Sequence, residues 1–136
     1  MKVSTFALAA SFSAVATSAL ADPCTAPLPP SGADFSGVVR YVGDGDGLCV
    51  GPTSDPSTWI EVRLSDFYAA ELHEPGGAEA KAALTRIAKG RVAECVAGRR
   101  SYDRVVAQCR IGGEEVGDLM RAAGVAEGGN GLGEGP

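Results

Sequence analysis

The chain has 136 residues, of which 12 are Lys or Arg, 17 are Asp or Glu and one is His. This length allows one small domain with a single hydrophobic core. The acidic balance argues against a protein that holds DNA on a broad basic face, but it leaves room for a compact phosphate site made of one or two arginines.

The first 21 residues have the features of a secretory signal peptide. Met1-Lys2 gives a short basic start, a weakly apolar stretch rich in Ala and Ser follows, and Ala19-Leu20-Ala21 has the small-x-small pattern of a cleavage site. The segment is too short and too rich in Ser and Thr for a membrane anchor. We therefore predict an exported chain, secreted or periplasmic, that begins at Asp22 and is not held in the membrane.

Residues 22–34 are rich in Pro, Ala and Gly and predict an extended leader. Three strands are then expected at residues 35–42, 48–50 and 59–67, with the glycine-rich turn GDGDG at 43–47 between the first two. In the third strand apolar and polar residues alternate, which predicts one core face and one polar face. The core face has Ile60, Val62 and Leu64, and the polar face has Glu61, Arg63 and Ser65.

A helix is expected between the Pro75-Gly76-Gly77 break and Gly90, because apolar residues recur there at the spacing of one helical face. These residues are Ala80, Ala83, Leu84, Ile87 and Ala88. A second, short helix is expected at residues 114–124, with a buried face of Val116, Leu119, Met120 and Ala123. The glycine-rich tail, residues 127–136, is predicted to be disordered.

Between the two helices, residues 91–98 and 102–111 predict a hairpin. All four cysteines follow the predicted cleavage site, and an even number in an exported chain indicates two disulfides. Three pairings are possible. A hairpin that turns at Tyr102 would place Cys95 opposite Cys109, and Cys24 would then pair with Cys49. Zinc is disfavoured, because the chain has no C-x2-C pair and one histidine.

The element order is three strands, a helix, two strands and a short helix, which is typical of an OB-fold. We therefore predict a mainly β protein with helices, in which a five-stranded OB-fold barrel carries two short helices. An open α+β sandwich fits the same pattern.

Three groups of polar residues are candidates for a site. Asp44 and Asp46 lie in a tight glycine turn, where alternate carboxylates can converge on Ca²⁺; an acidic hairpin turn is the alternative. Arg63 projects from the polar face of its strand and Glu71 follows in the loop, although a surface ion pair would explain both. Arg104 follows Tyr102-Asp103 at the hairpin, where ordinary turn chemistry is the alternative.

Four motifs in this order resemble the thermonuclease (staphylococcal nuclease-like) family: GDGDG, VRLSDFYAAELHEPGGAEAKAAL, SYDRVVAQC and the GG-EEVGDLMRAAGVA ending. The resemblance covers most of the predicted domain, residues 35–126. It implies an OB-fold enzyme that hydrolyses phosphodiester bonds of DNA or RNA with Ca²⁺. It also implies these roles: Arg63, Glu71 and Arg104 as the catalytic residues, Asp46, Asp44 and the carbonyl of Ala69 as metal ligands, and Tyr102 beside the substrate phosphate.

The chain departs from the family pattern in the loop that carries Glu71. Tyr68 stands where the family has a metal-binding aspartate, and a neutral phenol is a poor Ca²⁺ ligand. Ala70 replaces a proline, and Gly47 replaces a threonine common after the second aspartate of the turn. Asp66, two residues before Tyr68, is a candidate to supply the missing carboxylate; pairing with a nearby arginine is its alternative role.

The sequence thus predicts an exported, monomeric, metal-dependent nuclease with an altered Ca²⁺ site, acting on a nucleic acid or a nucleotide. The alternative is a catalytically weak or inactive OB-fold module that binds nucleic acid, a nucleotide or a protein. The complete set of Arg63, Glu71 and Arg104 favours the enzyme, whereas Tyr68 and the acidic balance favour the module.

Overall fold

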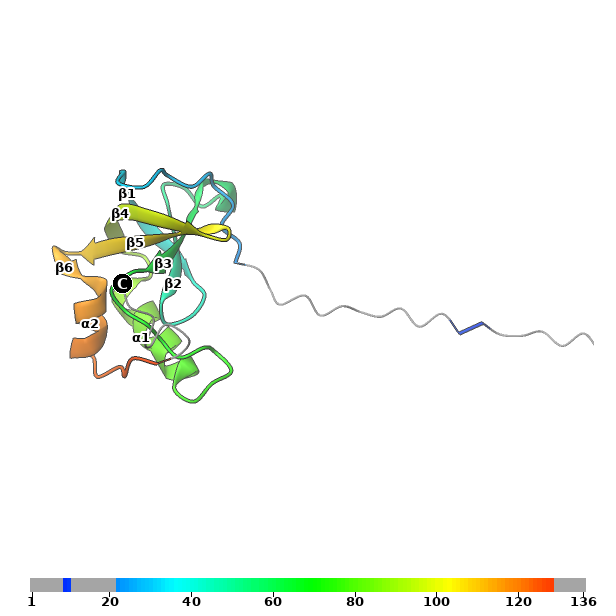
Figure 1. The fold of residues 1–136 in the computed structure, drawn as a ribbon, viewed down its shortest axis with the longest axis vertical. Helices are drawn as coiled ribbons and strands as arrows, with labels where there is room; N and C mark the ends of the chain where they lie inside the picture. The colour runs from blue at the N-terminus through cyan, green and yellow to red at the C-terminus, as the bar shows by residue number, and fades with distance from the viewer. Residues whose placement is uncertain (1–8, 11–21, 129–136) are drawn as a thin grey trace, which may run out of the picture.

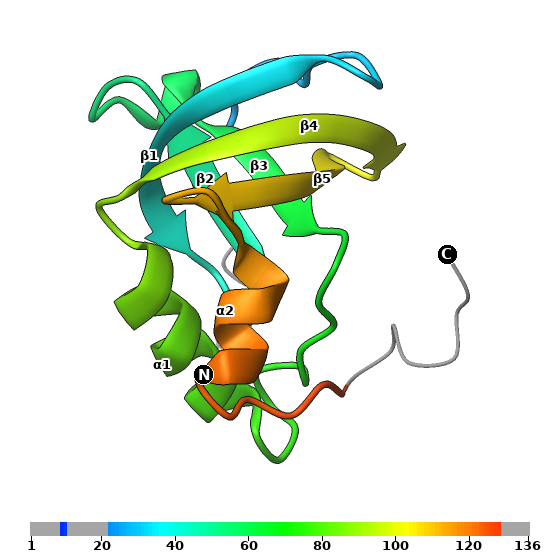
Figure 2. The same ribbon diagram turned by 90° about the vertical axis from the view of Figure 1, so that its left-hand side faces the viewer.

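Five strands close into a barrel, and two helices lie together at one end of it (Figures 1 and 2). This computed structural model describes residues 9–10 and 22–128. The prediction of an OB-fold-like barrel with two short helices is confirmed. The predicted signal peptide, apart from residues 9–10, and residues 129–136 of the predicted tail lie outside the described residues.

The barrel strands are β1 (Asp34–Val42), β2 (Gly47–Gly51), β3 (Ile60–Leu64), β4 (Val92–Ser101) and β5 (Arg104–Ile111). They pair antiparallel in the order β3-β2-β1-β4-β5, and a parallel pairing of β3 with β5 closes the barrel. A short β6 (Glu114–Glu115) pairs antiparallel with the end of β5, and a 3-10 turn, η1 (Pro56–Thr58), precedes β3. Closure leaves few free strand edges and brings β3 and β5, far apart in sequence, side by side.

The helices close one end of the barrel core. In α1 (Gly77–Ala88) the small side chains of Ala80, Ala83 and Ala88 are buried with Leu84, so the helix approaches the strands closely. In α2 (Val116–Ala122) the buried residues are Val116, Gly117 and Met120. The prediction that Ala123 is buried is wrong: the helix ends at Ala122, and Ala123 is exposed.

Two boundaries differ from the sequence prediction. The strand expected to reach residue 67 ends at Leu64, because the chain bends at Ser65 and sends Phe67 into the core, where it is fully buried. β4 continues to Ser101, past its predicted end at residue 98, and β5 begins at Arg104 instead of residue 102; Tyr102, in the turn between them, adopts the left-handed conformation with φ of 57°. Both changes lie beside the candidate site residues.

Both predicted disulfides, Cys24–Cys49 and Cys95–Cys109, are present. Two disulfides are consistent with an extracellular or periplasmic location. The first bond joins the leader to β2, and the leader also donates backbone N–H groups from Thr25 and Ala26 to the carbonyls of Pro56 and Trp59. Within the described part of the chain, neither helix has the length and apolar character that a membrane crossing requires.

Candidate active site

Arg63 and Arg104 lie on the same outer face of two neighbouring strands. In the parallel pairing of β3 with β5, Arg63 is opposite Val106 and Val62 is opposite Val105. Side chains alternate along a strand, so Arg104, two residues before Val106, shares the face of Arg63. Both arginines are half-buried. Barrel closure thus brings together two cations that are 41 positions apart in the sequence.

Asp46 connects the GDGDG turn to Arg63 and to the loop after β3. Its side chain is buried, with 6% of the residue exposed. One carboxylate oxygen, Oδ2, accepts a hydrogen bond from the Ala69 N–H at 3.1 Å and lies 3.7 Å from an Arg63 guanidinium nitrogen. The Asp46 N–H in turn donates to Oδ1 of Asp44 at 3.1 Å. Gly45 fits between Ala69 and Ala80, where a Cβ would lie 2.5 Å from each methyl group.

The two aspartates of this turn repel each other when both are ionised. The pKa of Asp46 is raised to about 7: burial is the largest cause, repulsion from Asp44 also raises it, and the Ala69 N–H and Arg63 lower it. A nearby cation would relieve this repulsion. The structure therefore brings together Asp44, Asp46 and the backbone of Ala69, the residues that the resemblance implies as metal ligands. No cluster of three or more His, Cys, Asp or Glu side chains suited to a metal occurs among residues 9–10 and 22–128.

Tyr68 covers the Arg63 guanidinium instead of supplying a carboxylate. The guanidinium carbon lies over the Tyr68 ring, 5.6 Å from its centre. Such a cation–π contact restrains the arginine and contributes about 0.5–1 kcal/mol at an exposed site. Asp66 makes its contacts elsewhere: its Oδ2 accepts a hydrogen bond at 3.1 Å from the N–H of Gly117, in α2.

Glu71 lies in the loop between β3 and α1 with its side chain half-buried. In the described part of the chain, no ion pair or hydrogen bond joins its carboxylate to Arg63 or Arg104. Its backbone is held firmly, because its carbonyl accepts the Glu74 N–H at 2.9 Å and Gly77 packs against it so closely that a Cβ there would overlap the carbonyl.

Tyr102 is placed at the tip of the β4–β5 hairpin, two residues before Arg104. It is 92% exposed, so its ring points into solvent and is free to contact a ligand. A hollow of about 340 Å³ separates this hairpin from the leader, and Arg100, Asp103 and Leu28 are among its lining residues.

Sequence reasoning missed Glu61 and Asp22. Glu61 was expected on the polar face of β3, yet only 8% of it is exposed, because the leader covers this part of the outer face. The signal was present in the predicted Cys24–Cys49 bond: Cys49 pairs with Glu61 in the β2–β3 ladder, so the disulfide holds the leader beside Glu61.

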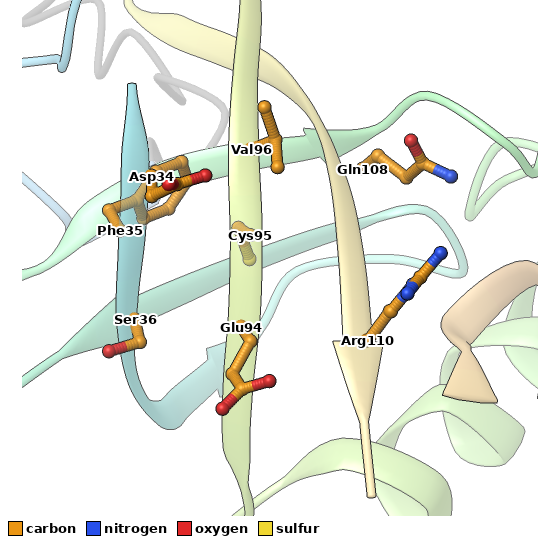
Figure 3. Close-up of a pocket in the computed structure, with 8 residues that line it drawn as sticks. All are labelled: Asp34, Phe35, Ser36, Glu94, Cys95, Val96, Gln108 and Arg110. Atoms are coloured by element: carbon orange, nitrogen blue, oxygen red, sulfur yellow. The ribbon is translucent and has the colours of Figure 1, made fainter. Parts of the chain in front are cut away.

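A hollow of about 560 Å³ lies on a different face, over β1, β4 and β5 (Figure 3). None of the sequence-predicted site residues lines it. Its lining residues are Asp34, Phe35, Ser36, Glu94, Cys95, Val96, Gln108 and Arg110. No family model matches the chain and no curated protein matches it, so the family resemblance depends on the four motifs alone.

Proposed function

We propose that the protein is an exported nuclease of the thermonuclease type, which acts as a monomer and hydrolyses phosphodiester bonds of DNA or RNA. The observation that carries the proposal is the placement of Arg63 and Arg104 on one face of adjoining strands, each beside a buried carboxyl group. The four motifs that resemble the thermonuclease family support the same reaction.

The two arginines would stabilise the transition state of the reaction. Attack on a phosphodiester places negative charge on the equatorial oxygens of the phosphorus, and a guanidinium donates two parallel hydrogen bonds to such oxygens. Arg63 has a single acidic contact, at 3.7 Å, and Arg104 makes no ion pair within 4 Å in the described residues. Donors that are fixed in place but not saturated favour the charged transition state over the ground state.

Glu71 would orient or deprotonate the attacking water. A carboxylate suits either task when it is within hydrogen-bond reach of the water, and such contacts often tighten only in the substrate complex. The close packing of Gly77 against the Glu71 carbonyl supports this role, because it fixes the backbone from which the side chain reaches the site.

The donors of the turn suit a weakly held Ca²⁺. Asp44, Asp46 and the carbonyl of Ala69 would hold it, since all three provide the oxygen ligands that Ca²⁺ accepts. When bound, the ion would act as a Lewis acid on the phosphate. With Tyr68 in place of a third carboxylate, we expect weaker binding than in a site with three.

The test is cleavage of a fluorescent oligonucleotide, DNA and RNA in parallel, by the protein that begins at Asp22, with Ca²⁺, Mg²⁺, Mn²⁺ or EDTA. We expect cleavage that Arg104→Ala lowers by about 10²–10³-fold, the usual effect of removing one transition-state donor. Arg99→Ala is the matched control, because Arg99 is an exposed arginine of the same hairpin. Equal cleavage by the two variants would refute the proposal.

A non-catalytic binding module is the second candidate. The observation that favours it is the Tyr68 ring against Arg63, which takes up space where the thermonuclease pattern has a metal ligand. In this case the oligonucleotide would bind, Arg104→Ala would weaken binding, and no divalent ion would produce cleavage. The same set of samples, measured by fluorescence anisotropy, separates the two functions.

A further inference from the structure

Two charged residues are buried in the described part of the chain, and each lies beside one of the two site arginines. These residues are Asp46 and Glu61. Asp46 contacts Arg63, as described above. Glu61 neighbours Arg104: Val62 pairs with Val105 in the parallel ladder, so the preceding residue on each strand is also adjacent on the outer face. Burying a carboxyl group is unfavourable without compensation, so two such groups at two functional arginines point to a shared purpose.

Charged groups face Glu61 from several elements. From the leader, Asp22 forms a hydrogen bond with its carboxyl group. Asp103 approaches from the β4–β5 turn and Arg104 from β5. Arg63, two residues along β3, shares its face. Cys49 of β2 contributes a disulfide and no charge.

These surroundings favour the neutral form of Glu61. Its pKa is raised to about 8: burial is the largest cause, the hydrogen bond with Asp22 and the charges of Asp103 and Asp22 also raise it, and Arg104 lowers it. A protonated Glu61 can donate its O–H to the Asp22 carboxylate, and its other oxygen can still accept a hydrogen bond from a neighbouring guanidinium. An ionised Glu61 would instead attract the Arg104 guanidinium by its charge.

Asp22 is held in place by its own contacts. The Cys24–Cys49 bond fixes the leader two residues away, and the Asp22 carboxylate lies against Gly43, where a Cβ would be 2.7 Å from Oδ1. The carboxylate thus touches the start of the GDGDG turn and the side chain of Glu61 at once.

We propose that Glu61, hydrogen-bonded to Asp22 of the leader, is a positioning residue that aims the guanidinium of Arg104 at the substrate phosphate. Its catalytic consequence rests on the proposed nuclease function, whereas the positioning itself is a property of the free protein. The leader then contributes a side chain, Asp22, to the site, in addition to its disulfide with β2.

The first measurement uses no substrate. In the full chain, in which Asp22 has no free α-amino group, the Arg104 Nε–H signal is identified by its loss in Arg104→Lys and followed by ¹⁵N NMR from pH 6 to pH 9. We expect its shift to titrate with a midpoint of about 8. Glu61→Gln should keep the signal and abolish the titration, and Asp22→Asn should displace the midpoint. Glu94→Gln and Asp34→Asn, which change exposed acids on β4 and β1, are the matched controls and should leave the titration unchanged.

The second measurement is cleavage kinetics. We expect Glu61→Ala to lower kcat by up to about 10²-fold, because a misplaced catalytic group loses rate more than affinity, with KM changed by less than about threefold. Glu61→Gln should restore much of kcat. If Glu61→Ala does not fold, Asp22→Asn replaces it.

An Arg104 signal that does not titrate, or titrates equally in Glu61→Gln, overturns the proposal. Absence of cleavage with a normal Arg104 titration refutes the nuclease function alone and leaves the positioning role standing.

Discussion

Two arginines flank the loop that follows β3, and they are used in opposite ways. Arg63 precedes the loop, lies near the buried carboxylate of Asp46 and stacks on an aromatic ring of the loop. Arg121 of α2 lies near the half-buried Asp66 and stacks on the ring of Phe67. Its guanidinium carbon is also 5.6 Å from the ring centre. The local chemistry is almost the same at the two ends, so the difference lies in how many donors each arginine has left.

The guanidinium of Arg121 uses three of its five N–H donors on acceptors in the protein. It donates to Asp118 at 3.1 Å, to Glu127 at 2.9 Å and to the backbone carbonyl of Asp66. Among the described residues, the one acidic partner of the Arg63 guanidinium is Asp46, at 3.7 Å. With three acceptors, Arg121 fixes α2 and the chain after it to the loop, whereas Arg63 keeps most of its donors available to a ligand. The number of unused donors, rather than the proximity of an acid, therefore distinguishes the functional end from the structural end.

The largest expected effect comes from removing one arginine at a time. Arg63→Ala should lower the rate of oligonucleotide cleavage by about 10²–10³-fold and leave the thermal midpoint nearly unchanged. Arg121→Ala should do the reverse, lowering the midpoint by about 4 °C for the loss of about 1 kcal/mol of partly exposed ion pairs. Both variants are measured for rate at 25 °C and for melting by circular dichroism. Loss of rate in both with no change in melting would show that the two ends do not differ.

The structural end can be tested at Asp66. Its buried Oδ1 has no hydrogen-bond partner within residues 9–10 and 22–128, and its Oδ2 accepts the Gly117 N–H. Asp66→Ala should lower the free energy of unfolding by about 1–3 kcal/mol, since it leaves that N–H unsatisfied.

Asp66→Asn keeps an acceptor for Gly117 and removes a charge that the site disfavours, because burial, and next the charge of Glu115, raise the pKa of Asp66. We therefore expect the Asn variant to be at least as stable as the wild type at pH 7. A carboxyl whose pKa is raised on folding loses stability as pH rises through the folded value, so the advantage of the Asn variant should shrink as pH falls towards 4. Urea unfolding at both pH values checks this, and a less stable Asn variant at pH 7 would contradict it.

The strands and helices of the barrel were predictable because their signals are local. Alternation in β3, the apolar spacing of α1 and the symmetry of Cys95 and Cys109 about the hairpin each depend on neighbours in the sequence. The burial of Glu61 was not, since it follows from a leader that crosses the outer face of another strand. The end of β3 at Leu64 was also missed, because Phe67 continues the apolar pattern of a strand but packs into the core after a bend.

In the candidate site too, the features that depend on long-range contacts could not be predicted from local sequence. The two arginines could be assigned to one site only through the family resemblance, because the parallel pairing of β3 with β5 is not visible in either strand alone. The contacts of Asp66 could not be predicted either: the sequence allowed a place near the turn, but its acceptor is used by the first turn of α2.

The smallest expected effect is a gain in stability with Ca²⁺, when a carboxylate replaces the ring that stacks on Arg63. Tyr68→Asp removes the ring from Arg63 and adds a third acid near Asp46, so without metal we expect a less stable protein. Ca²⁺ should reverse this: at ten times its Kd, binding to the folded state alone would add about 1.4 kcal/mol.

Tyr68→Phe is the matched control for Tyr68→Asp, because it keeps an aromatic ring against Arg63 and adds no charge. Thermal midpoints of the wild type and the two variants, each with EDTA, Mg²⁺ and Ca²⁺, give the comparison. Ca²⁺ should raise the midpoint of the Asp variant more than Mg²⁺ does, because Ca²⁺ tolerates irregular oxygen geometry. An equal response in the Asp and Phe variants would mean that Asp44, Asp46 and the new carboxylate do not converge, and that the turn serves Arg63 without a metal.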